Sequence, residues 1–185
     1  MRFSENRAIA WIVLAACVLG SVVGLGGAGM ARERKEIMQV FYDGTDKSST
    51  TRHSMDAYLD RALECCQVMA SEAQLALGEN ADAQQMLDTI AFFGDDDSLD
   101  TRYQAYQTMQ KLSDMLYNAM YAANLPDADR VNFKQAYDDF WGADKYIQKD
   151  AYRQMASGFN NEIDGFPAGL VCGIFGVNEL PTFGA

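Results

Sequence analysis

The side chains that could carry out acid–base chemistry or bind a metal are few and poorly spaced in this chain. His53 is the only histidine and lies in a polar segment, which argues against a histidine-based zinc site or a catalytic triad. The acidic run 95–97, followed by Asp100, lacks the alternation, the glycine and the distal glutamate of a calcium-binding loop. We interpret this run as the solvated start of a helix, where the helix dipole favours acidic side chains.

The cysteines and the paired acids have structural interpretations. Cys65 and Cys66 are adjacent and the chain has no CxxC motif, so no disulfide framework is indicated. Cys66 falls on an apolar helical seam and is predicted in the core, with Cys65 at its edge, while a disulfide from Cys66 to Cys172 is conceivable outside the cell. Carboxylate pairs such as 138–139 have no neighbouring base or nucleophile. We therefore predict no catalytic residue, no metal site, no cofactor and no enzymatic activity.

The elements that would position a site begin with an apolar N-terminal segment. After a short basic tail, residues 1–7, the chain has no charged residue from 8 to 31. As a helix rising about 1.5 Å per residue, this segment would be about 36 Å long, and the hydrocarbon core of a membrane is about 30 Å thick. We predict a single transmembrane helix, a signal anchor, over residues 8–31.

Two other interpretations of the same segment stay open. Residues 14–17, "LAAC", fit the cleavage motif of a lipoprotein, which would leave Cys17 lipidated as the new N-terminus. Cleavage near "AGMA", residues 28–31, would instead release the domain. The chain continues apolar well beyond Cys17, which favours the uncleaved anchor. Gly20 and Gly24 could form a helix-pairing face or only fill the span, so the oligomeric state is left open.

Charge limits the partners and bears on the side of the membrane. The net charge is −11 at pH 7, and such a surface repels phosphate backbones, so nucleic-acid binding is not expected. Arg2 and Arg7 precede the apolar segment, whereas Arg32, Arg34 and Lys35 follow it. Counting basic residues mildly favours a cytoplasmic domain. The short arginine-bearing start is typical of a signal anchor and favours an extracytoplasmic domain, which we adopt.

Residues 32–165 predict an antiparallel helical bundle, because apolar residues recur every three or four positions and sustained alternation is absent. The anchor helix should continue to about residue 42. Thr50 or Thr51 could begin the next helix, which Gly78 should end. The predicted core positions on successive helices are Met55, Leu59, Ala62, Cys66, Met69, Ala73 and Leu77, then Tyr106, Met109, Leu112, Leu116 and Met120, then Val131, Phe133, Tyr137, Phe140 and Trp141, and finally Tyr152, Met155, Phe159, Ile163 and Phe166.

The last helix and the segment after it carry a recurring set of residues: Tyr152-Arg153, Phe159-Asn160, Phe166-Pro167, Pro181 and Phe183. This set resembles the C-terminal signature of the LemA family, in which a Tyr-Asn pair recurs after seven residues and Phe-Pro, an apolar run and a further Pro with an aromatic follow. The apolar N-terminal segment running into "IMQVFYDG" fits the same family. Arg153 and Phe159 depart from the pairs, and "KYIQKDAYR" replaces an arginine-rich lead, so the chain resembles a divergent branch.

The resemblance implies a membrane-anchored helical bundle of the bacterial envelope with no established enzymatic activity. It supplies no catalytic residue. The residues that match the motif, with structural or partner-binding roles by this resemblance, are Tyr152, Phe159, Asn160, Phe166 and Pro167. From the residues themselves, we expect the Asn160 amide to bond across helices and fix their register. The nine tyrosines suit either the edge of a core or a partner-binding face.

Residues 166–185 are predicted to form an apolar C-terminal tail. Residues 166–177 carry no charge, but even as a helix they would extend only about 18 Å, too short to cross a membrane. Pro167 should end the preceding helix, and glycines discourage a strand. We expect a short helix or turn that folds back and places Leu170, Ile174 and Phe175 against the bundle end or the bilayer surface.

Two classes of function follow from these features. In the first, a protein anchored in the bacterial cytoplasmic membrane presents a non-enzymatic bundle to another envelope protein. In the second, the bundle binds a small molecule, a peptide or a lipid. The anchor, the acidic bundle and the lack of catalytic groups favour the first.

Overall fold

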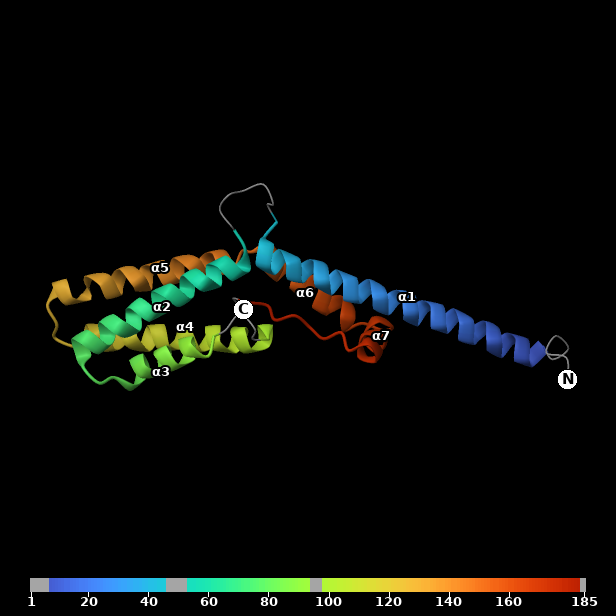
Figure 1. Ribbon diagram of the computed structural model, residues 1–185, viewed down its shortest axis with the longest axis horizontal. Coiled ribbons are helices and arrows are strands. Elements are labelled where there is room, and N and C mark those ends of the chain that lie inside the picture. The colour runs from blue at the N-terminus through green and yellow to red at the C-terminus, as the bar shows by residue number, and fades with distance from the viewer. Residues whose placement is uncertain (1–6, 46–52, 94–97, 184–185) are drawn as a thin grey trace.

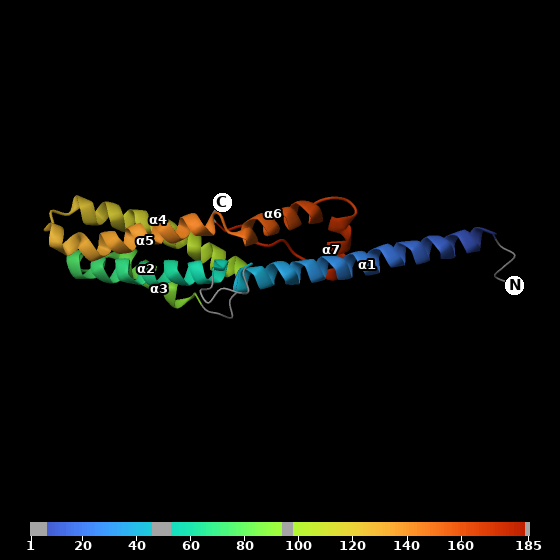
Figure 2. The same cartoon turned by 90° about the horizontal axis from the view of Figure 1, so that it is seen from above.

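The computed structural model describes residues 7–45, 53–93 and 98–183, and these ranges contain helices and no strand (Figure 1). The predicted all-α fold is therefore confirmed for the part of the chain that the structure describes. The helices form an elongated rod of two sections that lie end to end (Figures 1 and 2). The distal section contains α2 (Met55–Leu77), α3 (Ala81–Ala91), α4 (Leu99–Ala122), the short 3-10 turn η2 (Asp127–Arg130) and α5 (Val131–Ile147). The proximal section contains α1 (Arg7–Asp43), α6 (Ala151–Ile163) and α7 (Ala168–Phe175).

Helix α1 joins the apolar N-terminal segment to the folded part of the chain. It runs without interruption from Arg7 to Asp43, as the predicted extension of the anchor helix requires. It is the one helix in the described ranges that is long and apolar enough to cross a membrane. Its C-terminal end is part of the protein core, because Ile37 is 2% exposed and Phe41 is fully buried.

Successive helices of the distal section run in opposite directions (Figure 1). Side-chain caps fix where they begin: Ser54, Asn80 and Ser98 each accept a hydrogen bond from the backbone three residues on, which satisfies an orphan N–H at the helix start. Thr50 and Thr51, the predicted caps of α2, lie outside the described residues, and Ser54 holds the cap position. Gly78 ends α2 with φ of 78°, a conformation that glycine adopts without strain.

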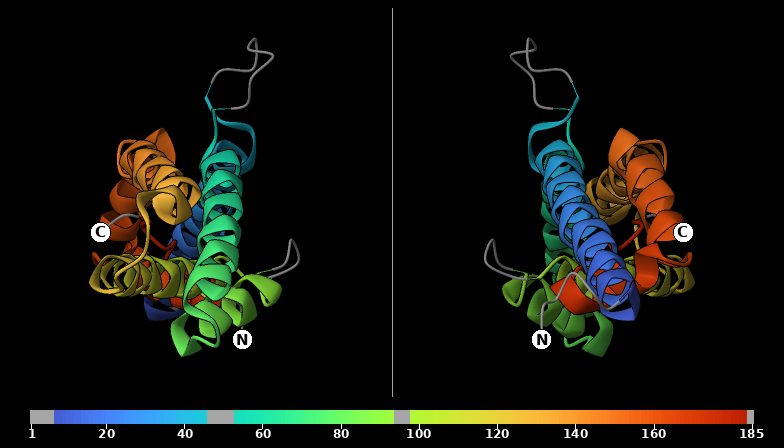
Figure 3. Two further views of the ribbon diagram at one scale, coloured as in Figure 1. Left: turned by 90° about the vertical axis from the view of Figure 1, so that its left-hand side faces the viewer. Right: turned by 90° about the vertical axis from the view of Figure 1, so that its right-hand side faces the viewer.

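The predicted seam of α2 is largely confirmed. Its first six positions are buried, and Leu77 is half-buried at the helix end. The placement of Cys65 at the edge was wrong, because Cys65 is 4% exposed beside the fully buried Cys66. Helix α2 packs against α3, α4 and α5 (Figure 3), so it buries more than one stripe of its surface.

The predicted core of α4 is buried at all five positions, whereas those of α5 and α6 hold only in part. Val131 and Met155 are exposed, and Phe166 is 90% exposed. Helix α6 ends at Ile163, before Phe166, and makes its main contacts with α1 and α7. A short helix, α7, follows Pro167 as expected. Leu170 and Ile174 are 57% and 62% exposed, so the expected docking on the bundle end is not found for these two side chains, whereas the ring of Phe175 lies against Gly27 of α1.

Candidate functional site

Tyr152 and Asn160 on α6 hold residues 177–183 of the C-terminal tail beside this helix. The Asn160 Nδ2 donates to the carbonyl oxygen of Leu180 at 2.7 Å, and the Leu180 N–H donates to Asn160 Oδ1 at 2.8 Å. The Tyr152 hydroxyl donates to the carbonyl oxygen of Pro181 at 3.1 Å. The Asn160 amide thus satisfies both backbone groups of one residue, as a neighbouring strand would. The predicted partner of Asn160, another helix, was wrong.

The local sequence of α6 explains why these side chains face the tail. Asp150 caps the helix, its carboxyl accepting from the Tyr152 N–H at 2.8 Å. Tyr152, Ala156, Phe159 and Ile163 are spaced by four, three and four residues, and all four are buried. This spacing forms one helix face, and Asn160 lies at its margin. Arg34 on α1 donates from Nε to the carbonyl oxygen of Asn178 at 3.2 Å, so the tail is held from both helices.

Phe183 ends the tail in an aromatic cluster at the junction of the two sections. Its ring lies 5.7 Å from Phe41 of α1 and 6.3 Å from Tyr152 of α6. The rings of Tyr103 and Tyr106 on α4 lie 5.3 and 6.2 Å from it. Phe183 is fully buried. The Phe183 side chain therefore contacts α1, α6 and the distal section.

A buried polar cluster adjoins this aromatic cluster. Asp144 of α5 is 2% exposed and accepts hydrogen bonds from the Tyr106 hydroxyl, from Gln110 Nε2 at 2.8 Å and from Gln148 Nε2 at 2.6 Å. Burial, and then the hydrogen bond to Asp144, raise the pKa of the Tyr106 hydroxyl, which therefore stays protonated and donates. The sequence analysis missed Asp144, although its place between Phe140 and Ile147 on an apolar stripe is a signal.

A second buried charge lies where α1, α2 and α4 meet. Arg102 is 2% exposed, and its Nη1 is 2.8 Å from Asp56 Oδ1. Its guanidinium lies over the rings of Phe93 and Phe41, at 4.7 and 5.4 Å from their centroids. Such stacking is favourable for a desolvated cation. Arg102 and Asp144 are thus each paired with a side chain from another helix. Buried pairs of this kind restrict how the helices of a core can pack.

An open groove of about 480 Å³ runs between α1 and α6. Glu33, Glu36 and Glu162 line it together with Arg32, which pairs with Glu36 at 2.9 Å. Burial raises the pKa of Glu33, and the charges of Glu162 and Glu36 raise it further. The groove is lined by acids without a nucleophile or a convergent donor set, so it offers no catalytic constellation.

An aromatic strip bridges α4 and α5 in the distal section. Tyr117 lies 4.4 Å from Tyr121 and 4.3 Å from Tyr137, and Tyr137 lies 6.2 Å from Trp141. Tyr121 is 39% exposed and the others are half-buried. We name these four residues the aromatic strip. Tyrosines were predicted either at the edge of the core or on a partner-binding face. The partial exposure of the aromatic strip is compatible with both roles.

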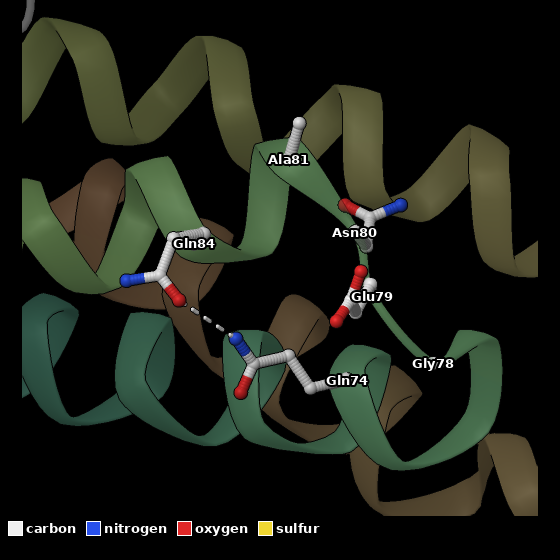
Figure 4. A pocket seen from close by; sticks show the side chains of 6 residues that line it. All are labelled: Gln74, Gly78, Glu79, Asn80, Ala81 and Gln84. Carbon is white, nitrogen blue, oxygen red and sulfur yellow. Dashed lines mark hydrogen bonds between the residues drawn. The ribbon is translucent and has the colours of Figure 1, made fainter.

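The remaining candidates do not converge on a second site. Cys17 is exposed on α1, far from the motif helix, and all four cysteines are free, so the conceivable Cys66–Cys172 disulfide is absent. Phe166 and Pro167 are exposed where α6 gives way to α7. No group of metal-binding side chains occurs among the described residues. A pocket at the α2–α3 turn is lined by polar and small residues, with Gln74 Nε2 donating to Gln84 Oε1 at 3.3 Å (Figure 4).

Comparison with known families, curated proteins and solved structures finds no match to this chain. The function of this chain is therefore inferred from its residues and from their arrangement.

Proposed function

We propose that this chain is a single-pass membrane protein of the bacterial envelope, similar to the LemA family, that acts by binding another envelope protein and not by catalysis. The observation that carries the proposal is the continuity of α1. One helix holds the uncharged segment 8–31 and also buries Ile37 and Phe41 in the protein core. A rigid connection of this kind holds the bundle at a fixed distance from the membrane.

The aromatic strip is the best-supported contact surface for a partner. Tyrosine and tryptophan are enriched at interface centres, because they combine a large apolar area with a polar tip. In this chain they line the distal section, the part of the rod farthest from residues 8–31 (Figures 1 and 2). At the margin of the aromatic strip, Asp114 accepts a hydrogen bond from the Tyr137 hydroxyl at 2.9 Å. Because Asp114 is acidic, a partner surface with a polar, basic rim would complement the strip.

Photo-crosslinking in intact cells tests the interaction. We expect a photoreactive amino acid at Tyr121 to give one discrete heavier product, because the strip faces the partner. The matched control is the same amino acid at Gln67, which is exposed on α2 outside the strip. Equal products at both positions, or none at Tyr121 at any expression level, would contradict the proposal.

The same proposal places the bundle on the extracytoplasmic side. We expect a Lys111→Cys variant to react with an impermeant maleimide in intact cells, because Lys111 is exposed on α4. Cys65, Cys66 and Cys172 are buried, so the unsubstituted chain measures the background. Labelling that requires lysis of the cells would place the bundle in the cytoplasm and overturn this part of the proposal.

A further inference from the structure

Helix α7 is apolar around its whole circumference yet is covered on one side only. Residues 166–177 carry no charge. Val171 and Cys172 are buried, whereas Leu170 and Ile174 are 57% and 62% exposed and Phe175 is 47% exposed. A soluble protein rarely leaves so many large apolar side chains of one short helix in water. Something other than the protein is expected to cover this face.

The buried side of α7 lies against the apolar segment of α1. Gly27 is buried under Phe175, and a Cβ placed on Gly27 would lie 2.2 Å from the Phe175 ring. A Cβ on the preceding Gly26 would lie 3.8 Å from Val171 Cγ1. Gly27 therefore lets α7 approach α1 closely, whereas a side chain at Gly26 would make only ordinary van der Waals contact. Both views in Figures 1 and 2 show α7 alongside α1, with α1 continuing beyond it.

The position of this contact along α1 sets the depth of α7. Gly26 and Gly27 precede Ala31, the last residue of the uncharged segment, by five and four residues. At about 1.5 Å per residue, the contact lies about 6–8 Å inside the end of that segment. Amphipathic helices in a membrane interface lie about 5–10 Å deep, at the boundary of headgroups and acyl chains. The charged residues Arg32, Arg34 and Lys35 then follow at headgroup level.

We infer that α7 is a second membrane element, an interfacial helix whose exposed face, with Leu170 and Ile174, is covered by lipid acyl chains of the leaflet next to the bundle. The inference rests on the proposed span of residues 8–31. Acyl chains fit the face because it carries no charge and adjoins the part of α1 that they would surround. With two contacts in one leaflet, the rod is held against rotation about α1, so the aromatic strip keeps one orientation to the membrane.

Fluorescence quenching in lipid vesicles tests this placement. The full chain with Cys17→Ser is labelled with an environment-sensitive dye at one introduced cysteine, in phosphatidylcholine–phosphatidylglycerol vesicles that contain spin-labelled lipid. The probe sites are Leu170→Cys and, as a second variant, Ile174→Cys. Val18→Cys, in the middle of segment 8–31 and 54% exposed, reports the span. Gln154→Cys, exposed on α6, is the matched control outside the membrane.

We expect quenching at Leu170 and Ile174 several-fold stronger than at Gln154, and stronger with the spin label near the headgroup than near the chain end. The Val18 probe should show the opposite depth preference. Quenching at Val18 with none above the Gln154 level at either α7 site would overturn the inference and leave the anchor intact. Absence of quenching at Val18 as well would overturn the anchor and the inference together.

Discussion

Replacing Asp144 with alanine is expected to lower the free energy of unfolding by about 2–4 kcal/mol, because the buried Tyr106 hydroxyl and the half-buried Gln110 amide would lose their acceptor. The Tyr106 hydroxyl and the amides of Gln110 and Gln148 all donate to this one carboxyl group. A small side chain at position 144 would leave the Tyr106 and Gln110 donors without this partner, in a site where Tyr106 and residue 144 are buried from water.

Urea titration of the full chain in a mild detergent, followed by circular dichroism, measures the effect. The matched control is Asp138→Ala on the same helix. Asp138 pairs with Lys134 and both side chains are more than half exposed, and exposed pairs contribute about 0–1 kcal/mol. A loss no larger for Asp144→Ala than for the control would show that the buried cluster does not stabilise the fold.

A Tyr106→Phe variant separates the hydroxyl from the ring. Phenylalanine keeps the packing against Phe140 and Phe183 and removes only the donor. If the hydroxyl acts through Asp144, the double variant should lose less stability than the two single losses added together, since neighbours that share a hydrogen bond are not additive.

The helices of this protein were predictable because their signal is local. The three-and-four spacing on α2 and α4 identified residues that the structure buries, and Gly78 ends α2 as expected. The error at Cys65 has a geometric cause. A single seam was inferred from the spacing, but α2 contacts α1, α3, α4 and α5, and a helix surrounded on several sides buries small residues next to its main stripe.

The opposite error occurred on α6. Met155 was predicted in the core but is 40% exposed, because α6 packs mainly on α1 and α7 and Met155 lines the open groove between α6 and α1. Periodicity reports which residues share a helix face, but it does not report how many neighbours that helix has. Phe166 was misplaced for a related reason, since the helix ends three residues before it.

The buried cluster and the tail contacts depend on residues that are far apart in the sequence. Asp144 bonds to a tyrosine 38 positions earlier, and Asn160 bonds to a residue 20 positions later. No local pattern predicts either partner. The polar interruption of the α5 stripe at position 144 could have indicated a buried acid, and the resemblance of the C-terminal motif marked Asn160 and Tyr152 as residues of interest without giving their role.

Replacing Phe183 with alanine is expected to be the more disruptive change, with a loss of about 3–5 kcal/mol, as for other fully buried phenylalanines. Its ring is in contact with aromatic rings of α1, α4 and α6, so its loss should leave a cavity where the two sections meet. The tail should also detach, because the three hydrogen bonds that α6 makes to residues 180 and 181 would no longer be supported by a buried end.

Two measurements distinguish detachment of the tail from general loss of stability. Urea titration gives the total loss, with Phe92→Ala as the matched control, because Phe92 is 79% exposed at the end of α3 and lies outside the core. Hydrogen exchange of the Leu180 amide reports the tail directly, since this amide donates to Asn160. In Phe183→Ala we expect exchange of the Leu180 amide to accelerate more than exchange of amides in the middle of α4, where the core of the distal bundle persists.

If every amide accelerated equally, the tail would be one part of a single cooperative unit and not the tie between the sections. Unchanged exchange at Leu180 would show that Asn160 and Tyr152 hold the tail by themselves.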